Sequence, residues 1–185
     1  STLLFANTKF HFDEIFVIRR NSSGVTTKRF MVPITYAQKE KFIRMLDELS
    51  KKMSANDIDD IKIIHRRYED TYLTEKSFDI LISNSVLHHV KSPKKFWEKS
   101  FNLVRQQGHI VLMDLFRPSN EHELLTILDK YGGNNPVLLN DFENSLRAAY
   151  TPYEVEGQLS SFPSISSSVK AISDRHFFVT IEIKK

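Results

Sequence analysis

The sequence contains no cysteine and only five glycines among its 185 residues. Without cysteine, neither a disulfide framework nor a thiolate metal site can form, so we expect a reducing, cytoplasmic location. No apolar run approaches the length of a membrane span, and we therefore expect no membrane partner. Lysine and arginine are spread along the chain rather than gathered with aromatic residues in a basic stripe, so we also expect no nucleic-acid partner.

What remains is the composition of an ordinary globular protein. The apolar fraction is 41%, the charged fraction is 26% and the net charge is +3. A chain of this length is most simply a single domain, here residues 1–185. Its interior is large enough to fold without disulfide bonds or structural metal ions. Within it, residues 1–37 differ in pattern from residues 38–185.

The front of the chain predicts a β-hairpin. Phe10 to Arg20 and Val25 to Ile34 are rich in β-branched and aromatic residues, and the turn-forming residues 21–24 lie between them. Pro33 argues against a long second strand in the centre of a sheet, because proline has no N–H to donate.

From Gln38 onward, helical and strand-like segments alternate. The predicted helices cover 38–53, a stretch that starts at Ser92–Pro93 and is ended by Gly108, a stretch capped by Ser119 and stopped by Gly132–Gly133, 141–150, and a stretch that starts at the capping box of Thr151. The predicted strands cover 61–64, 78–83, 109–115, 169–172 and 177–183. This order predicts a mostly parallel sheet with helices on both faces, closed at one edge by an antiparallel final pair.

Three segments carry a family resemblance. Ile61-Lys-Ile-Ile-His-Arg-Arg-Tyr-Glu-Asp70 resembles the third strand, and the loop beside adenine, of the class I S-adenosylmethionine-dependent methyltransferases. Ser77-Phe-Asp-Ile-Leu-Ile-Ser-Asn-Ser-Val-Leu-His-His-Val90 resembles their fourth strand and the loop that passes near the methionine end of the cofactor. Gly108-His-Ile-Val-Leu-Met-Asp114 resembles their fifth strand. Residues 151–154 and 173–176 are similar to tail features of small-molecule methyltransferases.

The resemblance implies a fold, a cofactor and a reaction. The fold would be a three-layer, Rossmann-like α/β methyltransferase sheet, mostly parallel with an antiparallel C-terminal strand, preceded by an atypical N-terminal hairpin. The cofactor would be S-adenosylmethionine, and a small molecule would accept the methyl group. The alternative is a non-catalytic binding or assembly module that keeps the sheet and has lost the cofactor site.

The front third departs from the family pattern. The family opens with a strand, a glycine-rich turn, a helix and a second strand that ends in an acidic residue for the ribose. Here Gly24 stands alone, only about seven residues before Met31, whereas a parallel crossover needs about a dozen. Thr35-Tyr-Ala37 holds no acid. Either the cofactor site has been lost or rebuilt, or a natural segment between about Arg19 and Tyr36 is absent from this chain.

Four residues are cofactor candidates by this resemblance. Arg67 stands where the family usually has an acidic residue beside adenine, and Tyr68 is placed to pack on adenine or in the core. Asn84, followed by Ser85, comes directly after the fourth strand and contacts cofactor or substrate, or else makes a local hydrogen bond.

The catalytic candidates are His88 and Asp114. His88 is the better placed of two adjacent histidines to face the substrate as a polar or basic group, with a structural role as the alternative. Asp114 ends the fifth strand at the same sheet edge and either lines the pocket or pairs with Arg117. No metal site is expected, because adjacent histidines rarely converge on one ion and no third ligand lies at useful spacing.

The remaining candidates have simpler interpretations. Trp97 is predicted to lie in the core, and residues 174–176 are predicted to be hairpin-turn residues. Tyr150 and Tyr153 either shape a substrate lid or pack between helices. If the first strand–helix–strand unit is missing, apolar residues of the sheet such as Ile80 and Ile82 lose part of their cover. We therefore expect a homo-oligomer or a protein partner at the N-terminal end.

Overall fold

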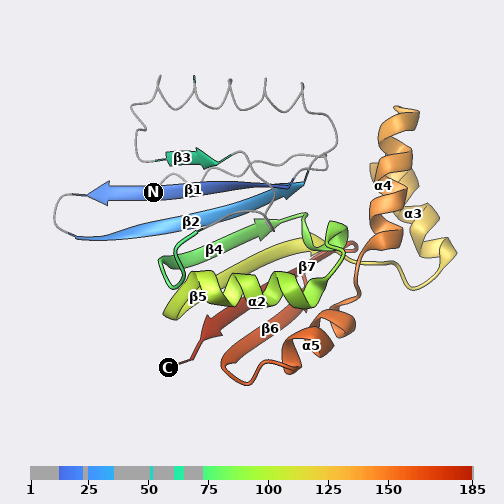
Figure 1. Cartoon of the computed structure of the whole chain (residues 1–185). Coiled ribbons are helices and arrows are strands. Elements are labelled where there is room, and N and C mark those ends of the chain that lie inside the picture. The colour runs from blue at the N-terminus through green and yellow to red at the C-terminus, as the bar shows by residue number, and fades with distance from the viewer. Residues whose placement is uncertain (1–12, 23–24, 36–50, 52–60, 65–72, 185) are drawn as a thin grey trace.

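The computed structural model describes residues 13–22, 25–35, 51, 61–64 and 73–184. Seven strands form one sheet, in the spatial order β3-β1-β2-β4-β5-β7-β6 (Figure 1). The strands are β1 Asp13–Ser22, β2 Val25–Thr35, β3 Ile61–Ile64, β4 Phe78–Asn84, β5 Val104–Leu115, β6 Ile165–Ala171 and β7 His176–Ile183. The helices are the 3₁₀ turn η1 Leu87–His89, then α2 Pro93–Leu103, α3 Glu121–Tyr131, α4 Pro136–Ala148 and α5 Pro152–Ser160.

The sheet is mixed, and its centre is parallel. β2 pairs parallel with β4, and β4 pairs parallel with β5. β7 runs antiparallel to β5, and β6 closes that edge as the antiparallel partner of β7. The predicted parallel neighbours 78–83 and 109–115 and the antiparallel final pair are therefore confirmed.

The predicted N-terminal hairpin is also confirmed, because β1 and β2 are antiparallel neighbours from Asp13↔Thr35 to Ser22↔Val25. The expectation drawn from Pro33 is wrong. β2 has 11 residues, includes Pro33 and lies between β1 and β4. The proline is accommodated because the pairing of β2 with β4 is recorded at Phe30 and Met31, before the proline.

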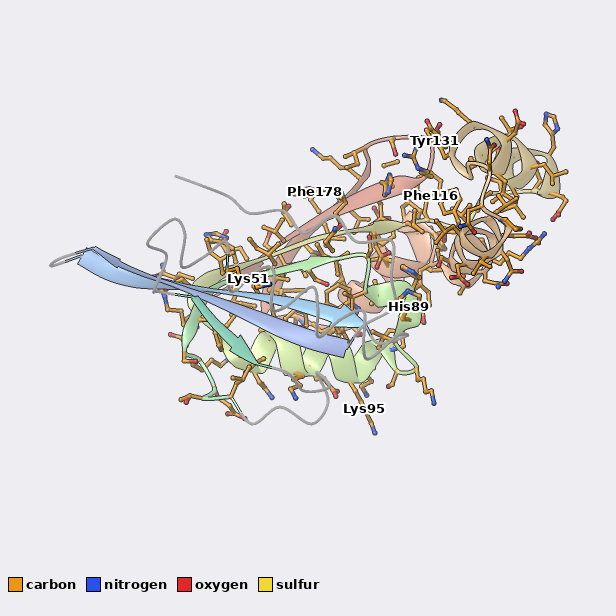
Figure 2. The ribbon with its side chains drawn as sticks, turned by 90° about the horizontal axis from the view of Figure 1, so that it is seen from above. Lys51, His89, Lys95, Phe116, Tyr131 and Phe178 are labelled. Carbon is orange, nitrogen blue, oxygen red and sulfur yellow. The ribbon has the colours of Figure 1, made fainter. Side chains whose placement is uncertain are left out.

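The main core lies between the sheet and the helices α2 and α5, which cover one face (Figure 1). Trp97 of α2 is fully buried there, as predicted, and its indole N–H donates to Gln158 of α5 at 2.9 Å. The opposite face of the sheet carries half-buried apolar side chains. Figure 2 shows one of them, Phe178, on the other side of the sheet from α2. These side chains are Ile80, Ile82, Val111, Met113 and Phe178.

A second, smaller core belongs to α3 and α4. These two helices lie beyond the end of the sheet toward which β4 points (Figure 1). We call this pair the helical cap. Its core consists of Leu115, Leu124, Ile127, Leu128, Leu146 and Ala149.

The end of α2 differs from the prediction. The helix ends at Leu103 and β5 begins at Val104, so Gly108 lies within the strand. From the Phe78↔Val104 pair to the Ile80↔His109 pair, β4 advances by two residues and β5 by five. The excess forms an irregularity in which a Cβ on Gly108 would lie 2.8 Å from the carbonyl oxygen of Asp79. Glycine is therefore required here for a close backbone approach rather than for a helix end.

Other boundaries also differ. The N-cap of α3 is Asn120, whose side chain accepts the Glu123 N–H at 2.9 Å, rather than Ser119. α4 begins at Pro136, five residues before the predicted start, because Asn135 caps it. β6 covers 165–171 rather than 169–172. The capping box at Thr151 is confirmed.

The predicted helix 38–53 lies outside the described residues apart from Lys51. In the part of the chain that the structure describes, no helix is both long enough and apolar enough to cross a membrane.

The packing predicts that a substitution in the core lowers the free energy of unfolding more than a substitution at the surface does. Leu81, in the middle of β4, is fully buried in the main core. Leu81→Ala should lower the free energy of unfolding by about 2–5 kcal/mol, because it leaves a cavity. Leu125→Ala removes a side chain that is 56% exposed and should change stability by no more than about 0.5 kcal/mol. Urea unfolding followed by the fluorescence of Trp97, the sole tryptophan, measures both; equal losses would contradict this core assignment.

Candidate functional site

The strand order reverses between β2 and β4. The strands beyond β4 follow as β5, β7 and β6, whereas those beyond β2 are β1 and β3. In open α/β sheets, ligands bind at the carboxyl ends of the strands at such a switch point. The register Phe30↔Ile80 and Met31↔Leu81, carried forward, brings the end of β2 level with Asn84. The candidate site is therefore the edge formed by the carboxyl ends of β2, β4 and β5.

The loop after β4 is held by backbone contacts to β5. Ser85 adopts a left-handed conformation with φ of 57°, which is uncommon for a residue other than glycine. Its N–H donates to the carbonyl oxygen of Met113 at 2.9 Å. The chain then turns through η1, where the N–H of His89 donates to the carbonyl oxygen of Val86 at 3.0 Å.

Asp114 is fully buried beneath this loop. Its Oδ2 accepts the N–H groups of Leu87 at 2.6 Å and His88 at 3.3 Å, and its Oδ1 accepts the N–H of Leu115 at 2.7 Å. Oδ1 also lies 2.5 Å from Nδ1 of His88. These contacts satisfy the buried carboxylate. Without them, burial of its oxygens with no hydrogen-bond partners would cost considerable free energy.

The two catalytic candidates are thus in direct contact, which the sequence did not predict. The alternative pairing of Asp114 with Arg117 is wrong. Arg117 instead donates to Glu154 at 2.5 Å and to the carbonyl oxygen of Ala149 at 3.1 Å. Arg117 therefore joins the segment after β5 to the start of α5.

Asn84 lies at the same edge but on the other face of the sheet. It pairs with Met113, whereas Ser83 pairs with Leu112, which shares its face with Asp114. Asn84 is half-buried, and its Oδ1 lies 3.5 Å from the Ser85 hydroxyl, a long local contact. The hydroxyl of Ser83 is buried with no hydrogen-bond partner among the described residues. The other two cofactor candidates, Arg67 and Tyr68, lie outside the described residues.

The helical cap adjoins this edge. α4 contacts η1, and Tyr131 at the end of α3 is fixed to the turn between β6 and β7 (Figure 2). The Tyr131 hydroxyl donates to Asp174 at 2.8 Å, and the Arg175 guanidinium lies 3.4 Å from the centre of the Tyr131 ring. The hydrogen bond from Tyr131 lowers the pKa of Asp174 to about 2, with Lys130 and Arg175 adding to the effect against desolvation.

The two tyrosines proposed for a lid are placed differently. Tyr150 is half-buried against the main core, and desolvation raises its pKa, with the Glu154 carboxylate adding to the effect. Tyr153 is 82% exposed. Among the described residues, no group of three histidine, aspartate or glutamate side chains could hold a metal ion.

Comparison with known proteins shows which fold this arrangement represents. Residues 35–112 match the family model described as a methyltransferase domain. A SAM-dependent methyltransferase from Aquifex aeolicus superposes with a TM-score of 0.53 and 14% identity, over 75% of this chain and 63% of that one. The chain therefore has the fold of the S-adenosylmethionine-dependent methyltransferases. It spans less than two thirds of the length of the Aquifex aeolicus methyltransferase.

Two further solved structures are similar. The plantazolicin methyltransferase BpumL, in complex with a pentazolic desmethylPZN analogue and SAH, has a TM-score of 0.56 and 11% identity, over 76% of this chain and 72% of BpumL. The YcgJ protein from Bacillus subtilis has a TM-score of 0.55 and 12% identity, over 77% of this chain and 79% of that one. Among curated proteins, no sequence matches this chain.

His176, paired with Leu115 at this edge, predicts a pH dependence of stability. Desolvation lowers its pKa, and Arg175 adds to the effect against Asp114 and Asp174. A lowered histidine pKa means that the unfolded chain binds the proton more tightly. This contribution to stability is therefore complete above about pH 6.5 and is lost as the pH falls toward the folded-state pKa.

We expect His176→Gln to reduce the fall in melting temperature between pH 7.5 and pH 5. His122→Gln, which removes an exposed imidazole on α3, is the matched control and should keep the wild-type fall. Thermal unfolding at the two pH values measures the difference. A His176→Gln profile as steep as that of wild type would contradict the expected role of His176.

Proposed function

We propose that the protein is an S-adenosylmethionine-dependent methyltransferase that acts on a small-molecule acceptor. The observation that carries the proposal is the loop after β4, which is held at the switch point of a class I sheet by Met113 and Asp114 of β5. A fixed loop at this position is what a site that works largely by orienting its ligands requires.

The cofactor is inferred from the position of the described residues. Asn84 is half-buried at the end of β4 and, among the described residues, makes only a long local contact, so its amide is suited to bind a polar group of a ligand. Ser85 follows it with a fixed backbone conformation. We assign both residues to the cofactor, and Arg67 and Tyr68 remain proposed contacts to its adenine end. BpumL, which has a similar fold, is described in complex with SAH.

Held by Asn84 and Ser85, S-adenosylmethionine would supply an electrophilic methyl group for transfer to the acceptor. His88 lies at this edge with Nδ1 on Asp114. A ring that donates from Nδ1 to a carboxylate holds its lone pair on Nε2 when it is neutral. The His88 side chain is itself only about 3% exposed. We propose that this nitrogen receives the proton only of an acceptor that reaches into the edge as far as the buried ring.

The acceptor class is inferred from the helical cap. α4 contacts η1, and the cap covers part of the edge at which an acceptor would approach. A covered edge favours a small acceptor over a polymer. The similarity of residues 151–154 and 173–176 to small-molecule methyltransferases agrees with this assignment.

A non-catalytic binding module is the second candidate. It is favoured by the hairpin between Ser22 and Val25, which replaces the glycine-rich turn and helix of the family pattern. A module of this kind keeps the sheet and binds another protein or a second copy of the chain at the N-terminal end. The half-buried apolar side chains Ile80 and Ile82 agree with such a partner surface.

Calorimetry with S-adenosylmethionine and S-adenosylhomocysteine separates the two candidates. The methyltransferase should bind both, and Asn84→Ala should weaken each by about tenfold, because a ligand polar group loses its hydrogen bond. Asn102→Ala, at an exposed position on α2, is the matched control and should leave both affinities unchanged. Absence of heat from a folded, full-length sample would refute the proposal and favour the binding module.

A further inference from the structure

Asp114 was a catalytic candidate because it ends β5 at the site edge, but its contacts indicate another role. Each hydrogen bond described for its carboxylate comes from an N–H group of this chain. Three donors are backbone groups, and the fourth contact is Nδ1 of His88. The side chain is about 1% exposed. A carboxylate so enclosed has no oxygen facing a ligand.

The partners of Asp114 belong to two elements. Leu87 and His88 lie in η1, whereas Leu115 is the next residue of β5. One residue earlier on β5, the carbonyl oxygen of Met113 accepts the N–H of Ser85. Two successive residues of β5 therefore determine the path of the loop from Ser85 to His88.

That path includes a conformation that the loop sequence does not favour. Ser85 has a positive φ, which costs a residue with a side chain about 1 kcal/mol and persists only where surrounding contacts enforce it. The contacts that enforce it are those of Met113 and Asp114. Without the carboxylate, the N–H groups of Leu87 and His88 would be left without their partner.

We propose that Asp114 is a positioning residue. It holds the loop after β4 in the shape that the cofactor site requires, and it does not touch the reacting atoms. The proposal rests on the proposed function for its link to the cofactor. The loop is also in contact with α4 through η1, so a change in the position of η1 would also affect the packing of the helical cap against the loop.

The test compares Asp114→Asn with a matched control at the other end of the same strands. Asp79→Asn removes a different link between β4 and β5, because the Asp79 carboxylate accepts Nε of Arg105 at 2.6 Å. Both changes replace a carboxylate by an amide of the same shape. Only Asp114→Asn directs an amide donor at backbone donors.

Two quantities are measured in each variant: hydrogen exchange at the amides of Leu87 and His88, and calorimetric affinity for S-adenosylhomocysteine. We expect Asp114→Asn to speed exchange at both amides and to weaken binding, each by about tenfold or more. Asp79→Asn should leave both within about twofold. His88→Ala keeps the backbone donor and should speed exchange less than Asp114→Asn does.

Unchanged exchange in a folded Asp114→Asn variant would overturn the proposal, and so would faster exchange with unchanged affinity. If wild type binds no S-adenosylhomocysteine, the proposed function fails, while exchange still decides whether Asp114 holds the loop. If Asp114→Asn does not fold, exchange in wild type decides: amides of Leu87 and His88 that exchange as fast as those of the exposed residues 133–135 would refute the proposal.

Discussion

The short connection between Ser22 and Val25 determines how the N-terminal strands β1 and β2 can be arranged in the sheet. A connection of that length can join antiparallel neighbours but cannot return the chain to a parallel position. β2 therefore lies beside β4 with an antiparallel neighbour, β1, where the doubly wound order would have a parallel strand and a helical crossover. The switch point is kept, but among the described residues no turn and helix connect β1 to β2. The described half of the site is consequently built from β4, β5 and the loop between β4 and α2.

That loop shows how a buried carboxylate can organise the edge that forms the candidate site. Backbone N–H groups in a tight turn need acceptors, and a buried carboxylate needs donors. Asp114 and the η1 backbone meet both needs at once, whereas exposed ion pairs such as Lys94 with Glu98 contribute little to a defined structure. The same arrangement fixes the ring of His88. Position at the site edge therefore does not make a residue a chemical participant.

The sequence predicted features that depend on neighbouring residues. The apolar runs of β4 and β5 and the Thr151 capping box were read correctly, because strand burial and helix caps leave local patterns. The end of α2 was misread, because Gly108 serves a close contact with Asp79, 29 positions earlier in the chain. The contact of His88 with Asp114 spans 26 positions and left no local signal. The cofactor candidates Arg67 and Tyr68 remain predictions.

The helical cap has an interior of its own. Of the residues described in that interior, Leu115 is the one contributed by the sheet, and the others lie in or directly after α3 and α4. Two cores that share so little can change independently, because additivity holds for sites without common partners. Substitutions in α3 and α4 can then change the surface beside the candidate site while the structure of the sheet is unchanged. A fold divided in this way lets one part tolerate substitutions that the other part does not feel.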